Sequence, residues 1–235
     1  MKSAISPFLV VNPKSYLYGA EALALAQAAD AAAKKTGLKI YFTCPFSDIR
    51  YIRAHTESII VTAQAMESLK PGRGMGHLLP EAIRDAGARA TFLNHAENPM
   101  TVAELSKTIL RARGLGIETI ACADSLAEGT AIAAFRPDIL LCEPTDLIGT
   151  GKTADDDYTV SIVAKIRSVD PAIGIMIASG ITTADDVYRV VRLGADGSGA
   201  TSGILNAPDP GKRIEEMAEA IVRAAADRAS ADNAL

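Results

Sequence analysis

The chain has 235 residues, of which 49% are apolar and 22% charged, so its composition is that of a globular protein rather than a disordered one. Its formal net charge is −4, it carries no basic tract, and no apolar run approaches the roughly 18 residues that cross a membrane. We therefore expect no nucleic-acid partner and no membrane partner. Three cysteines without zinc or disulfide spacing, and the lack of a signal-peptide pattern, favour a cytoplasmic protein that needs no metal.

Short apolar runs alternate with longer, alanine-rich amphipathic stretches along the whole chain. Most of the short runs lack polar alternation, which is typical of strands buried on both faces. The predicted strands cover residues 8–11, 38–43, 58–63, 90–93, 118–121, 138–142, 173–178 and a last stretch near 195–200. The predicted helices cover residues 20–35, 46–54, 78–87, 102–113, 126–134, 155–168, 184–193 and 212–228.

Helix-start motifs recur at intervals that match one strand plus one helix. The capping-box spacing, Ser or Thr followed three residues later by Asp or Glu, occurs at Thr101/Glu104, Ser125/Glu128, Thr153/Asp156 and Thr183/Asp186, in steps of 24, 28 and 30 residues. Eight strand–helix units in 235 residues give about 29 residues each, close to a minimal (β/α)8 barrel. A doubly wound sheet is the alternative, but it usually needs fewer strands, and no G-x-G-x-x-G follows the first one.

The sequence therefore predicts a single (β/α)8 barrel over residues 1–225. No linker, low-complexity segment or change in composition interrupts this stretch. The remaining residues, 226–235, are rich in alanine, aspartate and serine, and we expect this C-terminal tail to fray.

In such a barrel the functional residues lie at the carboxyl ends of the strands. Asn12 and Lys14 follow the first predicted strand, His95 and Glu97 follow the fourth, and Glu143 follows the sixth. Small-residue turns follow the last two strands, at Ser179-Gly180 and Ser202-Gly203. One rim thus gathers a cation, an imidazole, a carboxylate and backbone N–H groups. This set suits proton transfer on a small anionic substrate.

Four segments resemble the triosephosphate isomerase family, in its short archaeal-type form more than in the longer bacterial and eukaryotic one. They are Asn12-Pro-Lys14, Leu93-Asn-His95-Ala-Glu97, Glu143-Pro-x-x-Leu-Ile-Gly149-Thr150-Gly151 and Ser179-Gly180-Ile. The similarity runs in order from residue 8 to about residue 210. The third segment is the most specific, because a base at a strand end followed at once by a glycine-hinged lid is unusual.

The resemblance implies a TIM barrel and an aldose–ketose isomerase. Such an enzyme interconverts dihydroxyacetone phosphate and glyceraldehyde 3-phosphate through an enediolate, in glycolysis and gluconeogenesis, without metal or organic cofactor. The family is the standard worked example of a glutamate base, a neutral histidine and a loop that excludes water, so these roles come from the resemblance alone. Glu143 is implied as the base, His95 as the electrophile that polarises the carbonyl, and Lys14 as the group that stabilises the oxyanion. Asn12 is implied as the residue that orients this set, and Glu97 as a residue that contacts the catalytic side chains rather than the substrate.

The phosphate of this small sugar substrate needs its own partners. Small residues ahead of predicted helices leave backbone N–H groups unpaired, and such groups favour an anion. We therefore expect the substrate to be bound by the lid at Gly149 and Thr150, and by the turns at Ser179, Gly180, Ser202 and Gly203.

A glycine-rich segment, residues 70–78, carries Arg73 and an apolar residue, Met75. It resembles the interface loop of the family, where a His-Thr-Gly triplet usually stands in place of Gly74-Met75-Gly76. An exposed apolar tip usually needs a partner surface, so we expect a homodimer or homotetramer with this loop inserted into its partner.

The eighth strand departs from the family, because residues 197–201 are Gly-Ser-Gly-Ala-Thr where bulky aliphatics usually stand. This leaves space in the barrel or admits a neighbour such as Met176. If the space opens toward the rim, a four-carbon ketose phosphate becomes the alternative substrate. Two further alternatives are a non-catalytic sugar-phosphate binding protein and a nucleotide-binding protein. For the latter, residues 149–153 resemble the end of a P-loop, but Asp146 stands where that motif needs glycine.

Overall fold

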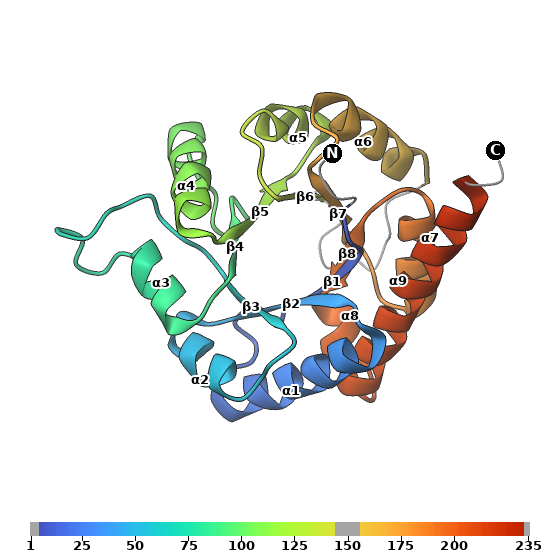
Figure 1. The fold of residues 1–235 in the computed structure, drawn as a ribbon, viewed down its shortest axis with the longest axis horizontal. Helices are drawn as coiled ribbons and strands as arrows, with labels where there is room; N and C mark the ends of the chain where they lie inside the picture. The colour runs from blue at the N-terminus through green and yellow to red at the C-terminus, as the bar shows by residue number, and fades with distance from the viewer. Residues whose placement is uncertain (1–4, 144–155, 233–235) are drawn as a thin grey trace.

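The computed structural model describes residues 5–143 and 156–232, which form a closed barrel of eight parallel strands inside a ring of helices (Figure 1). The strands follow one another around the barrel in chain order: β1 (Phe8–Val11), β2 (Lys39–Cys44), β3 (Ile60–Ala63), β4 (Ala90–Leu93), β5 (Glu118–Ala123), β6 (Ile139–Cys142), β7 (Gly174–Ile177) and β8 (Gly197–Ala200). β8 pairs with β1, with Phe8 beside Gly197, and this pairing closes the barrel. The predicted single (β/α)8 TIM barrel is confirmed.

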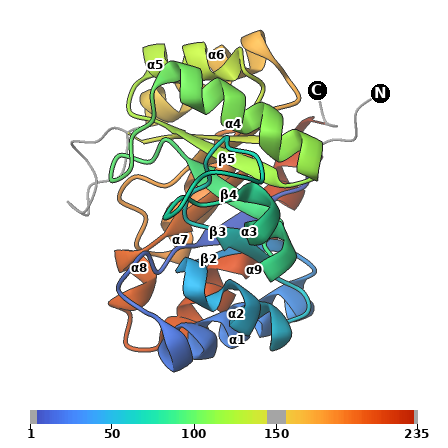
Figure 2. The ribbon, with the colours of Figure 1, turned by 90° about the vertical axis from the view of Figure 1, so that its left-hand side faces the viewer.

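The helices lie outside the barrel wall. They are α1 (Gly19–Thr36), the 3-10 turn η1 (Phe46–Asp48) with α2 (Ile49–Ala54), α3 (Pro80–Ala86), α4 (Val102–Leu115), α5 (Leu126–Ala133), α6 (Asp156–Val169), α7 (Ala184–Arg192), α8 (Ser202–Leu205) and α9 (Pro210–Asp232). Every predicted helix is present. The single turn α8 was not predicted, and it lies on the face where the carboxyl ends of the strands emerge (Figure 2). No helix in residues 5–143 and 156–232 has the length and apolar character needed to cross a membrane.

Side-chain hydrogen bonds cap the N-termini of three helices at the positions predicted from the sequence. Thr101, Ser125 and Thr183 each accept a hydrogen bond from the backbone N–H three residues further on. Only at Thr183 does the acidic partner, Asp186, also bond back to the cap and complete a capping box. Thr153 lies outside the described residues.

Helix α9 continues through residues 226–232, most of the tail that is expected from the sequence to fray. Its last turns are tied to α7 and to the segment after it. The Arg228 Nη1 donates to the carbonyl oxygens of Val191 at 3.0 Å and Ala195 at 2.7 Å, and the Tyr188 hydroxyl donates to Asp227 at 2.7 Å. An alanine-rich stretch also has high helix propensity, so these contacts extend a helix that the residues already favour.

Apolar side chains fill the space on both sides of the barrel wall. The cluster inside the barrel consists of Phe8, Val10, Tyr41, Ala90, Phe92, Ile120, Cys122, Ile139, Leu141 and Met176. Alternate residues of the same strands, such as Leu9 and Val11, pack against the helices outside. Both faces of each strand are therefore buried, which explains why the strands lack polar alternation.

The two glycines of β8 accommodate larger neighbours inside the barrel. A Cβ added at Gly197 would lie 2.5 Å from both the Phe8 ring and the Phe8 carbonyl oxygen. A Cβ added at Gly199 would lie 2.6 Å from the Val10 carbonyl oxygen and 2.7 Å from the Met176 methyl group. The small eighth strand is thus matched by a bulky side chain on each neighbouring strand, as expected for the Met176 alternative.

We expect Gly197→Ala to lower the free energy of unfolding by about 1–3 kcal/mol, because the added methyl group would press on a paired strand. Gly114→Ala in α4 is the matched control, since a Cβ there meets nothing within 4 Å. Alanine should stabilise that exposed helical position by about 0.5–1 kcal/mol. Urea unfolding of both variants measures the two effects, and equal stability of the variants would contradict the close packing at Gly197.

Candidate active site

A cavity of about 630 Å³ opens at the carboxyl ends of the strands. It brings together seven of the eleven predicted site residues: Asn12, Lys14, His95, Glu97, Glu143, Gly180 and Ser202. Ser179 is buried behind the lining, Gly203 packs beneath it, and Gly149 and Thr150 lie outside the described residues. The cavity wall also includes Tyr16, Thr182 and Thr201, which the sequence analysis did not single out as site residues.

Lys14 is held in a left-handed backbone conformation, with φ of 49°, which is uncommon for a residue with a side chain. The Asn12 side-chain oxygen accepts the Lys14 N–H at 3.0 Å and also accepts the Thr43 hydroxyl. The Gln64 amide donates to the Lys14 carbonyl oxygen at 2.6 Å. The Lys14 ammonium, aimed into the rim, pairs with Glu97 at 2.6 Å. Three neighbouring strands thus fix one cation in place.

The His95 ring is arranged to be neutral. Its Nδ1 accepts the backbone N–H of Glu97 at 3.1 Å, so the ring proton belongs on Nε2. Burial lowers the pKa of His95, the nearby Lys14 charge lowers it further, and only Glu97 opposes this. A neutral imidazole with a proton on Nε2 can donate a hydrogen bond without transferring a full charge.

Asn94 directly precedes His95, and its side chain anchors this part of the chain. The sequence analysis does not predict this role. Asn94 has a positive φ of 56°, and its side chain makes three hydrogen bonds. The amide donates to the Cys122 carbonyl oxygen and to Glu128, both at 3.0 Å, and the side-chain oxygen accepts the Met100 N–H at 2.9 Å. An asparagine beside a histidine is the only sequence feature that marks this position.

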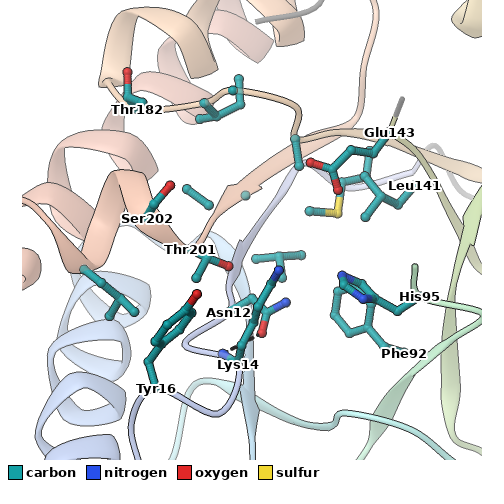
Figure 3. A pocket seen from close by; sticks show the side chains of 18 of the residues that line it. Asn12, Lys14, Tyr16, Phe92, His95, Leu141, Glu143, Thr182, Thr201 and Ser202 are labelled. Atoms are coloured by element: carbon teal, nitrogen blue, oxygen red, sulfur yellow. Dashed lines mark hydrogen bonds between the residues drawn. The ribbon is translucent and has the colours of Figure 1, made fainter. Parts of the chain in front are cut away.

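Glu143 directly follows β6, and its N–H donates to the Ala123 carbonyl oxygen at 2.9 Å. Burial raises the pKa of its carboxyl group above the usual 4.5, and the Lys14 charge opposes part of that rise. Figure 3 shows the carboxylate of Glu143 and the ring of His95 pointing into the same cavity. A carboxylate with a raised pKa is a stronger base than one in water.

The opposite side of the cavity is formed by Thr182, Thr201 and Ser202 (Figure 3). Gly180 and Ser202 line the cavity, and their backbone N–H groups donate to no group within residues 5–143 and 156–232. The buried Ser179 hydroxyl also has no hydrogen-bond partner there. Unpaired donors of this kind bind anions. The cavity therefore has one side with the ionisable groups of Lys14, His95 and Glu143 and one side with unpaired hydrogen-bond donors.

Within residues 5–143 and 156–232, the three cysteines and the carboxylates outside the cavity form no metal site. Cys44, Cys122 and Cys142 are free and buried, and burial raises the pKa of the Cys142 thiol to about 12. In the part of the chain that the structure describes, no group of three or more metal-ligating side chains lies together.

We expect Glu143→Gln to raise Tm at pH 7, because burial costs the ionised carboxyl group more than it costs a neutral amide. The folded pKa is raised, so below about pH 4.5 the group is protonated in both states and the variant gains nothing. As pH rises past the folded pKa, the wild type loses stability that the variant keeps. A gain of about 1 kcal/mol corresponds to about 2–4 °C.

Thermal unfolding at pH 4 and pH 7 measures this difference. Glu219→Gln is the control, since that carboxylate is exposed on α9. A pH-independent Tm difference for Glu143→Gln would show that burial does not penalise its charge.

Comparison with known proteins agrees with this geometry. The family model for triosephosphate isomerase matches residues 7–221. The chain is 36% identical over 217 residues to the triosephosphate isomerase of Methanoculleus marisnigri, covering 90% of this chain and 97% of that protein. It is 32% identical to the triosephosphate isomerases of Sulfurisphaera tokodaii, covering 90% and 93%, and of Methanobacterium bryantii, covering 92% and 97%. These relatives are archaeal. The chain belongs to the triosephosphate isomerase family.

Proposed function

We propose that this chain interconverts dihydroxyacetone phosphate and glyceraldehyde 3-phosphate by proton transfer between adjacent carbons. The observation that carries the proposal is the pairing of Glu143 and His95 in one cavity. Burial raises the pKa of the carboxyl group and lowers the pKa of the imidazole, so a base and a neutral proton donor face the same space. A substrate placed between them would meet both.

In the proposed reaction, Glu143 removes a proton from the carbon next to the carbonyl. The electrons of that C–H bond form the enediolate, and its oxyanion is stabilised by the Lys14 ammonium and by the Nε2–H of His95. His95 Nε2 gives its proton to the oxygen of the former carbonyl and takes the hydroxyl proton from the oxygen of the first carbon, which becomes the new carbonyl. Glu143 then returns its proton to the neighbouring carbon, so the carbonyl has moved by one carbon and nothing is consumed. Asn12 holds Lys14 in position, and Glu97 fixes the Lys14 ammonium and the His95 tautomer.

The substrate phosphate is proposed to lie on the opposite side of the cavity, against the N–H groups of Gly180 and Ser202. Gly149 and Thr150, which lie outside the described residues, are included in this proposal because the sequence analysis expects them to bind the phosphate as well. The reaction is proposed to take place in the cytoplasm, since the family is a cytosolic glycolytic enzyme.

Substrate length is the part of this proposal that needs measurement. The four-carbon alternative depends on free space beside β8, and the methyl group of Met176 fills the position next to Gly199. We therefore expect kcat/KM to be higher for dihydroxyacetone phosphate than for four- and five-carbon ketose phosphates. A higher value for a four-carbon substrate would replace the proposed one.

We expect Glu143→Gln to lower kcat by about 10²–10⁴-fold, because an amide cannot accept the proton. KM should change little, since the amide is isosteric and leaves the anion-binding side intact. Steady-state kinetics in both directions measure this, with Glu219→Gln as the control for the substitution itself. Near-native turnover in Glu143→Gln would remove Glu143 from the mechanism.

We also propose that the chain forms a homodimer or homotetramer through the loop between β3 and α3. This loop projects from the side of the barrel (Figure 1), and the side chain of Met75 within it is fully exposed. A second cavity of about 200 Å³, lined in part by Phe46, Ala65 and Phe92, lies beside Lys14. An exposed apolar side chain and a cavity with a partly apolar lining on one chain suit a symmetric contact between two copies.

We expect the wild type to sediment as a dimer or larger, and Met75→Asp to shift it toward the monomer, because an unpaired charge would enter an apolar contact. Val222→Asp, on the exposed face of α9, is the control that adds the same charge elsewhere. Sedimentation velocity over a range of concentrations measures this. A wild type that is monomeric and fully active at all concentrations would reject the proposal.

A further inference from the structure

The two turns on the anion-binding side of the cavity meet backbone to backbone. A Cβ added at Gly203, in the turn after β8, would lie 2.4 Å from the Ile181 carbonyl oxygen and 2.7 Å from the Thr182 Cα, in the turn after β7. No side chain fits between these turns at that point. The two turns therefore pack directly against each other, and side chains at the edges of this junction are the ones that can hold them together.

Arg213, in the first turn of α9, makes such a contact with both turns. Its Nη1 donates to the Thr182 carbonyl oxygen and to the Gly203 carbonyl oxygen, the latter at 3.5 Å. The side chain is only 23% exposed, and its Nε is buried at 3.6 Å from Glu216. Arg213 does not line the cavity, so it acts on the turns and not on a bound molecule.

The geometry points to Arg213 as a positioning residue for the anion-binding side of the cavity. By holding one carbonyl oxygen of each turn, it fixes the spacing between the N–H groups of Gly180 and Ser202, two residues that line the cavity from different turns. Two donors converge on one phosphate only if that spacing is kept, and an error of about 1 Å can cost about 100-fold in rate. This inference rests on the proposed function, since it assigns those N–H groups to the substrate phosphate.

The same helix supplies a matched control at its other end. Arg228 Nη1 also donates to two carbonyl oxygens, those of Val191 and Ala195, and its side chain is 27% exposed. Those carbonyl groups lie before β8, at the end of the barrel away from the cavity. Replacing either arginine removes the same kind of contact at similar burial, but only Arg213 touches the two turns.

The test compares Arg213→Met, Arg213→Lys and Arg228→Met. Calorimetric titration gives the Kd of inorganic phosphate, and kinetics give kcat/KM for glyceraldehyde 3-phosphate and for D-glyceraldehyde, which has the reacting carbons without the phosphate. We expect Arg213→Met to raise the phosphate Kd about tenfold and to lower kcat/KM for the phosphorylated substrate by at least as much. Its kcat/KM for D-glyceraldehyde should stay within about twofold of the wild type, because the acid–base side is untouched.

The other variants separate positioning from general stability. Arg213→Lys keeps the charge but lacks the planar fork, so its phosphate Kd should rise by less than that of Arg213→Met. Arg228→Met should lower Tm and leave the phosphate Kd within about twofold of the wild type. Wild-type phosphate affinity in both Arg213 variants would overturn the inference, and so would an equal rise in Arg228→Met.

Two remaining outcomes are also decisive. If neither Arg213 variant folds while Arg228→Met does, Arg213 has a structural role and the inference is overturned. If the wild type does not isomerise triose phosphates, the proposed function fails, yet the phosphate Kd of the variants still decides whether Arg213 positions an anion site.

Discussion

Glu143 lies at the end of β6, where its carboxylate is largely removed from water. The free-energy cost of this desolvation is the constraint on which the arrangement of the surrounding groups depends. A glutamate in water is a weak base toward a C–H bond, and burial strengthens it by raising its pKa. The same burial opposes folding, so the position has to be held by the barrel wall. The hydrogen bond from Glu143 N–H to Ala123 and the full burial of Cys142 before it supply that restraint.

The charge of Lys14 affects the pKa of both Glu143 and His95. It lowers the pKa of each group. For Glu143 this limits the rise in pKa caused by burial. For His95 it adds to burial, so the ring stays neutral. Glu97 has the opposite effect on both groups, and its pairing with Lys14 moderates that cation. One ammonium near two half-buried groups therefore acts on the pKa of both, against the effect of burial at Glu143 and with it at His95.

The sequence predicts the barrel and the rim because both depend on local pattern. Apolar runs without polar alternation mark strands with two buried faces, and the residue after each strand must lie on the rim. That reasoning placed Asn12, Lys14, His95 and Glu143 together. It could not predict the left-handed backbone at Lys14 and Asn94, because neither residue type requires it. Each is held there by contacts from other strands, and backbone strain of this kind often accompanies functional side chains.

The contacts of α9 show a second limit of local pattern. Arg213 and its carbonyl partners are 31 and 10 residues apart in the chain, and nothing in the sequence around Arg213 distinguishes it from Arg228. Both arginines lie on one helix and bind carbonyl oxygens, yet they face opposite ends of the barrel. At the end away from the cavity, Lys39, Tyr41 and Glu118 form a further polar cluster that joins β2 to β5. Contacts at that end hold the strands together, whereas the same chemistry at the rim sets the spacing of the turns. The position along the barrel axis, rather than the residue type, decides whether an arginine serves stability or the site.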